Sequence, residues 1–303
     1  MIIVQITNKY FTGERILYGL KDAKLEGVTF GKGESPLKEA RNLEIKDSFF
    51  TWKYPLWYDQ HIKVDNTTFE TMARSGIWYT DDIKISSSAL QAPKLFRRCS
   101  QIDLEHVHFA NAEETMWSCK QIRITDSTIN GDYFGKDSQD IFLDHVSVIG
   151  NYVFDGAKNI EVHNSTFISK DAFWNCENVK IYDSVIDGEY LAWNTKNITL
   201  INCQITSSQG LNYIDNLTIK HSKILNSELL FEYCSRIDIE VDNALVSVKN
   251  PISGRIVAPE IGTLILDQTK VDPDKTQVIC NNILKRMDSS DLNQTPKVKE
   301  YEI

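Results

Sequence analysis

Residues 169–186 read SKDAFWNCENVKIYDSVI, and residues 188–205 read GEYLAWNTKNITLINCQI. Each stretch contains an aromatic residue, then Trp-Asn, then a further Asn, and finally two aliphatic residues separated by one polar residue. The first aliphatic residues of the two pairs, Val179 and Ile198, lie 19 positions apart. A pattern that returns at a short, fixed interval is typical of a solenoid, in which each repeat forms one coil.

The same aliphatic pair returns along most of the chain at intervals of 19–21 residues. The first residues of the pairs are Ala23, Leu43, Ile62, Ile83, Ile102, Ile122, Ile141, Ile160, Val179, Ile198, Leu217 and Ile237. The second residues are Leu25, Ile45, Val64, Ile85, Leu104, Ile124, Leu143, Val162, Ile181, Leu200, Ile219 and Ile239. The residue between them is polar in nearly every repeat, so each coil is predicted to contain a half-buried strand.

Two solenoid architectures have this strand pattern, the leucine-rich repeat and the parallel β-helix. A leucine-rich repeat needs a leucine three residues before the strand. Small residues occupy that column instead, namely Ala40, Thr80, Cys99, Cys119, Ser138, Ala157, Cys176 and Thr195. Spacings near 19 residues are also short for a leucine-rich repeat. We therefore predict an all-β, single-stranded parallel β-helix with about twelve regular coils and three faces per coil.

The extent of the repeat sets the predicted domain boundaries. Residues 1–280 are predicted to form the β-helix, with regular coils at about 14–244 and irregular final coils at 245–280. Residues 281–303 are predicted to be a polar C-terminal tail that covers the open end or is disordered.

The composition is that of a soluble globular protein, with 42% hydrophobic and 25% charged residues among 303. A net charge of −9 argues against a nucleic-acid partner, because phosphate binding needs a basic surface. The N-terminus lacks the features of a signal peptide, and no apolar stretch is long enough to span a membrane. We expect a cytoplasmic protein that has no membrane partner.

The cysteines follow the repeat. Cys99, Cys119, Cys176 and Cys234 share the column three residues before the strand pair, and Cys203 occupies a column of small residues after it. We expect buried, free thiols without disulfides, as in a reducing compartment. The six histidines are scattered over outward columns, so we predict no metal site and no cofactor.

An aromatic and charged column lies five residues before each strand pair. It holds Lys38, Trp57, Trp78, Arg97, Trp117, Lys136, Asp155, Trp174, Trp193, Asn212 and Glu232. A column with unpaired charges cannot be core, so its tryptophans are predicted to be partly exposed. The columns eight and nine residues before the pair add Tyr133, Tyr152, Tyr190 and Lys170. Aromatic rings stack on pyranose faces and charged groups bind hydroxyls, so these tryptophans, tyrosines and Lys170 are predicted to bind a glycan along one groove.

A catalytic centre is predicted where charges interrupt the tryptophans. The candidate residues are Arg97, Asp132, Lys136, Asp155, Asp171 and Glu189. Two carboxylates could hydrolyse a glycosidic bond, whereas a basic residue could act as the base of a polysaccharide lyase. The same charges could instead form an ion-pair ladder, and the aromatic strip could dock a protein partner or a second copy of the chain.

Several motifs occur in order along most of residues 1–270. They are GESPLKEARN (33–42), WKYPLWY (52–58), GIWYT (76–80), APKLFRR (92–98), GDYFG (131–135), SKDAFWNCENV (169–179) and GEYLAWN (188–194). With these motifs the chain resembles a bacterial domain-of-unknown-function family in the pectin-lyase-like group of right-handed parallel β-helices. The resemblance implies the fold and its handedness, and it implies no catalytic residue. The wider group includes pectate lyases, polygalacturonases and non-catalytic members, which favours carbohydrate hypotheses.

Overall fold

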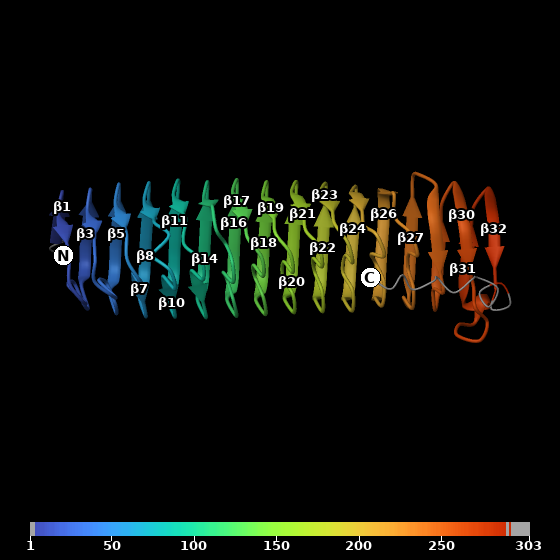
Figure 1. The fold of residues 1–303 in the computed structure, drawn as a ribbon, viewed down its shortest axis with the longest axis horizontal. Coiled ribbons are helices and arrows are strands. Elements are labelled where there is room, and N and C mark those ends of the chain that lie inside the picture. The colour runs from blue at the N-terminus through green and yellow to red at the C-terminus, as the bar shows by residue number, and fades with distance from the viewer. Residues whose placement is uncertain (1–3, 289–290, 292–303) are drawn as a thin grey trace, which may run out of the picture.

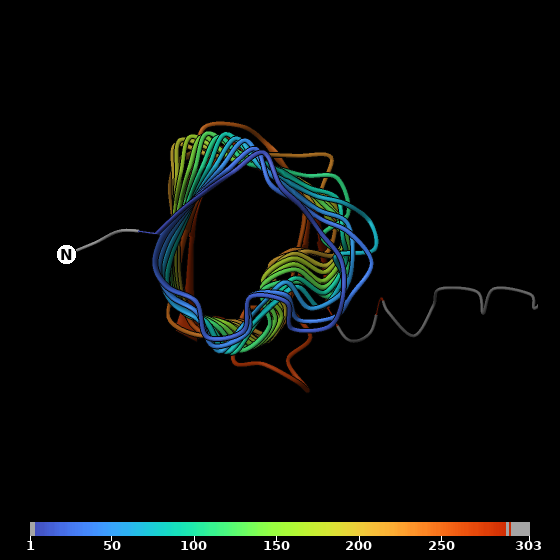
Figure 2. The same ribbon diagram turned by 90° about the vertical axis from the view of Figure 1, so that its left-hand side faces the viewer.

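The protein is a right-handed parallel β-solenoid of about 15 turns. The structure is a computed structural model, and it describes residues 4–288 and residue 291. The coils lie side by side along one long axis, from the blue N-terminal coil to the red C-terminal one (Figure 1). Viewed along this axis, most coils nearly coincide, and the last ones depart in wider loops (Figure 2). The predicted fold class is confirmed.

The first column of strands, called sheet A, contains one strand from every turn. Its strands are β1 (Val4–Thr7), β3 (Lys21–Glu26), β5 (Arg41–Lys46), β8 (Gln60–Asp65), β11 (Asp81–Ser86), β14 (Ser100–Glu105), β16 (Lys120–Thr125), β18 (Gln139–Asp144), β20 (Lys158–His163), β22 (Glu177–Tyr182), β24 (Lys196–Ile201), β26 (Asp215–Leu225), β27 (Ile237–Val241), β29 (Gly254–Val257) and β31 (Thr276–Ile279). All neighbours are parallel, and Val179 pairs with Ile160 and Ile198 in the register that the repeat predicts.

A second column, called sheet B, follows sheet A after a tight corner. Its strands are β2 (Tyr10–Phe11), β4 (Thr29–Phe30), β6 (Phe49–Phe50), β9 (Thr68–Phe69), β12 (Ala89–Leu90), β15 (His108–Phe109), β17 (Thr128–Asn130), β19 (Ser147–Ile149), β21 (Thr166–Ile168), β23 (Val185–Asp187), β25 (Gln204–Thr206) and the second half of β26.

The third face, called face C, is less regular. It contains the short strands β7 (Leu56–Trp57), β10 (Ile77–Trp78) and β13 (Phe96–Arg97), and turns occupy its place in the later coils. Near the C-terminus, β28 (Leu245–Lys249), β30 (Glu260–Ile265) and β32 (Asn282–Met287) form a further parallel sheet, and a 3-10 helix, η1 (Pro273–Lys275), precedes β31. Within the described part of the chain, no helix has the length and hydropathy needed to cross a membrane.

The number of turns exceeds the twelve predicted from the side-chain repeat. β1 pairs with β3 before the first repeat, and β29 and β31 continue sheet A after the repeat has faded. Parallel pairing joins backbone groups, so it persists where the spacing and the side chains become irregular. Strand β32 lies within the stretch predicted to be a polar tail, and residues 289–290 and 292–303 of that stretch fall outside the described residues.

Two ladders of side chains hold the coils together. Inside, the rings of Phe11, Phe30, Phe50 and Phe69 stack with centroid distances of 5.7, 4.9 and 4.7 Å. Outside, amide groups connect the starts of successive sheet A strands, from Asp140 through Asn159, Asn178 and Asn197 to Asn216, over 2.8–3.0 Å. These Asn and Asp residues have positive φ values, which both residue types tolerate because their side chains bond locally.

All six cysteines are free thiols, and five of them are buried. Burial raises the pKa of the Cys203 thiol to about 11 and that of Cys234 to about 12. It also raises the pKa values of Cys119 and Cys176. Because the thiolate is the reactive form, these groups are expected to be inert in the folded protein.

We expect a thiol reagent to modify only Cys280 rapidly in the native protein, because this thiol alone is partly exposed. After denaturation of anaerobically purified protein, the same reagent should titrate all six thiols. Cys280→Ser is the matched variant and should abolish the fast native reaction. Fewer than four thiols in the denatured protein would contradict the prediction.

Candidate functional site

The predicted tryptophan column lies along face C and is half-buried. Each indole Nε1 donates a hydrogen bond to a backbone carbonyl of the next coil. The acceptors are Ser75 for Trp57 (2.6 Å), Lys94 for Trp78 (3.0 Å), Tyr133 for Trp117 (2.6 Å), Tyr190 for Trp174 (2.8 Å) and Gln209 for Trp193 (2.6 Å). The polar edges of these rings therefore connect coils, and they are already occupied.

The faces of these rings also meet neighbours within the column. Trp57 and Trp78 are parallel with centroids 5.1 Å apart, and Trp174 and Trp193 are stacked at 5.9 Å. The guanidinium of Arg97 lies 5.2 Å from the Trp78 ring and 4.4 Å from the Trp117 ring. Adjacent coils are about 4.8 Å apart, which is close to the distance at which aromatic rings stack. Side chains at the same position of adjacent coils therefore contact each other's ring faces. The stacking predicted for a sugar is thus made by neighbouring side chains.

The predicted catalytic residues form separate pairs. Lys136 Nζ is 2.6 Å from Asp155 Oδ2, and the other oxygen of Asp155 accepts a hydrogen bond from Asn175 at 2.9 Å. The hydrogen bond with Asp155 raises the pKa of Lys136. Lys170 pairs with Glu189 at 3.4 Å on the exposed surface. These contacts between adjacent coils match the ion-pair ladder that was the alternative interpretation.

Asp132 and Arg97 lie apart from those pairs. Asp132 accepts a hydrogen bond from the backbone N–H of Asn151 at 2.7 Å. Arg97 donates to Glu114 at 2.9 Å, and Trp117 separates it from Lys136 in the column. The six predicted residues therefore do not converge on one point.

Asp171 is the most unusual of the predicted residues. It is 2% exposed, and its Oδ1 is buried without a hydrogen-bond partner among the described residues. Burial raises the pKa of Asp171, and the hydroxyl of Tyr152 interacts with the carboxyl. Tyr152 also stacks on Tyr133 at 4.7 Å. In this arrangement the Asp171 carboxyl therefore lies below the surface, beside the Tyr152 hydroxyl.

A depression with exposed aromatic rings lies near the N-terminal end, at the corner between face C and sheet A. We call it the Tyr58 pocket, and it has a volume of about 550 Å³. It is lined by Tyr18, Gly19, Lys21, Glu39, Arg41, Tyr58, Gln60 and Tyr79. Our sequence reasoning missed it because the column four residues before the strand pair was not considered.

The Tyr58 pocket exists because a stack of rings ends there. The rings of Tyr58 and Tyr79 are parallel, with centroids 4.8 Å apart. In the two coils before Tyr58, the same column holds Glu39 and Gly19. One face of the Tyr58 ring therefore meets Tyr79, while the other borders the depression, where Lys38 Nζ lies 5.4 Å from the ring centroid. This broken column is the signal that could have revealed the pocket.

Glu39 is held in place on the other side of the Tyr58 pocket. Its Oε2 accepts a hydrogen bond of 2.6 Å from the hydroxyl of Tyr18. This bond raises the pKa of Tyr18, because the neutral phenol is the donor. A carboxylate, an amide from Gln60 and a ring face are thus presented together.

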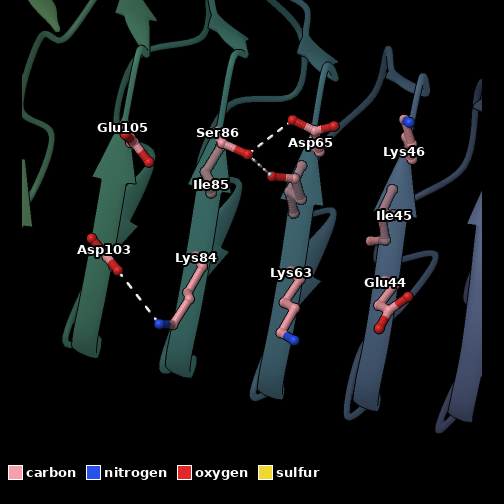
Figure 3. Close-up of a pocket in the computed structure, with 11 residues that line it drawn as sticks. Glu44, Ile45, Lys46, Lys63, Asp65, Lys84, Ile85, Ser86, Asp103 and Glu105 are labelled. Carbon is pink, nitrogen blue, oxygen red and sulfur yellow. Dashed lines mark hydrogen bonds and ion pairs between the residues drawn. The ribbon is translucent and has the colours of Figure 1, made fainter. Parts of the chain in front are cut away.

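A second depression, of about 380 Å³, lies on the outer face of sheet A across β5, β8, β11 and β14 (Figure 3). In Figure 3, Lys84 and Asp103 reach toward each other, at 3.5 Å, and Ser86 donates a hydrogen bond to Asp65 at 2.9 Å. Glu44, on the same face, pairs with Lys24 at 2.6 Å. No aromatic residue lines this depression, which offers charged groups but no platform for a sugar ring.

One set of side chains could hold a metal ion. Glu105, His106 and Asp126 each offer a ligand atom, and these atoms lie within 4.8 Å of one another. All three residues are exposed, at the corner that follows sheet A. Oxygen and imidazole ligands suit several divalent ions, so the absence of a metal and a cofactor stays a prediction.

Solved structures with the same architecture have little sequence identity to this chain. The surface protein and adhesin PfbA of Streptococcus pneumoniae is 12% identical, with a TM-score of 0.32, over 89% of this chain and 74% of that one. A tailspike protein mutant of E. coli bacteriophage HK620, in complex with a hexasaccharide, is 10% identical, with a TM-score of 0.41, over 88% of this chain and 61% of that one. The A-module of the Azotobacter vinelandii mannuronan C-5 epimerase AlgE4 is 9% identical, with a TM-score of 0.25, over 94% and 88%.

No curated protein matches the chain significantly. One protein family matches residues 4–279, which is nearly the whole of the described solenoid. The chain therefore belongs to the family described as Protein of unknown function (DUF3737).

Proposed function

We propose that this protein binds carbohydrate in the Tyr58 pocket. The observation that carries the proposal is the end of the Tyr79–Tyr58 stack, where one ring face borders a depression of about 550 Å³. An aromatic face offers an apolar platform for the C–H face of a pyranose. Glu39 and Gln60 beside it supply an acceptor and an amide for hydroxyl groups.

The proposal concerns binding and includes no reaction. The residues predicted to be catalytic form ion pairs with charged neighbours or accept from a backbone N–H, and Asp171 is buried. Each predicted tryptophan platform on face C has at least one ring face against a neighbouring ring or guanidinium. The Tyr58 pocket combines an aromatic ring face, bordered by Lys38, with the carboxylate of Glu39 and the amide of Gln60. An apolar platform with nearby polar groups is what a sugar-binding site contains.

We expect Tyr58→Ala to weaken binding of a responsive oligosaccharide about tenfold, which corresponds to ~1.4 kcal/mol. The reason is the loss of the stacking platform at the end of the column. Intrinsic fluorescence can report the titration, because the Trp57 and Tyr58 ring centroids are 6.4 Å apart. The ligands would be a panel of neutral and acidic oligosaccharides, with calorimetry to confirm each response.

Tyr213→Ala is the matched control, since Tyr213 occupies the same column in a distant coil and is 40% exposed. It should leave affinity unchanged. The absence of any response from the panel, or equal losses in both variants, would overturn the proposal. A change of solution mass in Tyr58→Ala, measured by light scattering, would instead identify the pocket as an interface between copies of the chain.

A further inference from the structure

Two like charges lie directly opposite each other in sheet A at the edge of the Tyr58 pocket. Lys21 in β3 and Arg41 in β5 are register partners, and both side chains are exposed. Neither forms an ion pair within the part of the chain that the structure describes. Like charges at directly opposed positions destabilise a sheet.

Elsewhere on sheet A, several basic residues pair with carboxylates on the adjacent coil. On the same two strands, Lys24 pairs with Glu44 at 2.6 Å. Farther along, Lys84 pairs with Asp103 at 3.5 Å, and Lys158 pairs with Glu177 at 3.2 Å. Lys63 and Lys84 are also like-charged register partners, but there Lys84 pairs with Asp103. The Lys21–Arg41 pair differs in that neither member has a carboxylate partner among the described residues.

The Lys21–Arg41 pair lines the same depression as the Tyr58 ring. The nearby carboxylate of Glu39 is directed to the hydroxyl of Tyr18 at 2.6 Å, and no ion pair joins Glu39 to Lys21 or Arg41 in the described chain. The next register partner in the column is Gln60, which is uncharged. The depression therefore has a cationic edge, an aromatic platform and a hydrogen-bonding wall.

We infer that the Tyr58 pocket binds a sugar residue that carries an anionic group, with the anion against Lys21 and Arg41 and the sugar ring on Tyr58. The inference rests on the proposed function and specifies its ligand. The planar guanidinium of Arg41 can bind a carboxylate or a sulfate through two parallel hydrogen bonds, and Lys21 adds a point charge. Such a ligand would relieve the repulsion between the two side chains.

The protein has a net charge of −9, so a preference for an anionic ligand would come from the two cations at the pocket and not from the overall charge. The overall field repels an anionic glycan at long range, whereas the two cations attract it within a few ångströms. Added salt screens the exposed charges, so affinity for the acidic ligand should fall as ionic strength rises. Affinity for a neutral ligand should change little.

The test uses tetrasaccharides that share linkage and stereochemistry but differ in charge. They are (1→4)-linked glucose and glucuronate tetrasaccharides, (1→4)-linked galactose and galacturonate tetrasaccharides, and a sulfated glucose tetrasaccharide. The full-length protein is expected to bind the acidic member of at least one pair about tenfold more tightly than the neutral member. Comparison of the uronate ligands with the sulfated ligand shows whether the pocket prefers a carboxylate or a sulfate group.

Lys21→Gln and Arg41→Gln should each remove most of this preference while retaining the affinity for the neutral ligand. Lys196→Gln is the matched control, because Lys196 occupies the same strand position in the distant β24 and is exposed. Circular dichroism and thermal unfolding should show that all three variants fold. We expect both pocket variants to be as stable as the native protein or more stable, because each removes a like-charge contact.

The outcomes separate this inference from the proposed function. Equal affinity for acidic and neutral ligands, with a loss in Tyr58→Ala, would overturn the inference and leave carbohydrate binding intact. A preference for acidic ligands that survives both Lys21→Gln and Arg41→Gln would also overturn it. Absence of binding by every tetrasaccharide would overturn both.

Discussion

Replacing Phe50 by alanine is expected to lower the free energy of unfolding by about 3–5 kcal/mol. Phe50 lies in β6 and is completely buried. Its ring stacks between Phe30, at 4.9 Å, and Phe69, at 4.7 Å. Truncation removes buried apolar surface and leaves a cavity inside a closed coil, where backbone pairing on both sides prevents collapse.

Phe49→Ala is the matched control, because Phe49 is adjacent in β6 but points outward and is 45% exposed. Its effect should stay within about 1 kcal/mol. Urea unfolding followed by circular dichroism measures both variants. A loss below about 1 kcal/mol for Phe50→Ala would show that the column of rings does not stabilise the solenoid in the way the distances indicate.

Replacing Asp59 by threonine is expected to raise the free energy of unfolding by about 1–3 kcal/mol at pH 7. Asp59 is fully buried, its Oδ1 accepts a 2.8 Å hydrogen bond from the Ala40 N–H, and its Oδ2 has no hydrogen-bond partner in the described chain. Thr80, one coil later in the same column, uses its hydroxyl both to donate to the Leu56 carbonyl (3.0 Å) and to accept from the Asp59 N–H (3.4 Å). A threonine at position 59 can adopt the same arrangement without a buried charge.

The stabilisation by Asp59→Thr should depend on pH in a defined direction. Burial raises the pKa of Asp59 well above its ordinary value, whereas in the unfolded chain this carboxyl titrates near pH ~4. As pH rises above ~4, the unfolded state loses its proton first, so the native protein loses stability until the pH passes the folded-state pKa. The variant lacks this loss, and the difference between the two proteins should grow from pH ~4 upward.

Carboxylates in ion pairs act in the opposite direction at lower pH. The hydrogen bond with Lys94 lowers the pKa of Glu114, and that with Lys220 lowers the pKa of Asp238, so their stabilising effects are lost only as the pH falls through their lowered pKa values. Urea unfolding of both proteins at several values between pH ~4.5 and ~7.5 avoids that range. Asp187→Thr, at an exposed position in β23, is the control and should unfold in parallel with the native protein. If the free energies of unfolding of Asp59→Thr and the native protein changed equally with pH, the prediction would be contradicted.

The regular part of the fold could be predicted from the repeat alone. Val179 and its equivalents identify the strand register. These features repeat in each coil, so one reading of the pattern applies to many positions. The extra turns at both ends escaped prediction because they are joined by backbone pairing, which leaves little trace in the side chains.

The candidate site depended on contacts that the pattern did not reveal. The tryptophan column was recognised, but its ring faces and indole N–H groups are used between coils. Asp171 belongs to a column with the exposed Tyr133, yet it is buried, because a short carboxylate lies below the tips of its longer neighbours Tyr152 and Tyr190. Exposure within one column therefore depends on the adjacent side chains.

The sequence by itself determined the solenoid, its strand register and the inward side chains, because burial repeats with the chain's own period. Only the tertiary structure decided where a ligand could bind. The Tyr58 pocket arises where Glu39 and Gly19 interrupt a column of rings, and its cationic edge arises where Lys21 meets Arg41 instead of a carboxylate. A binding site in a repetitive fold is a local departure from the repeat, and its shape is set by the coils on either side.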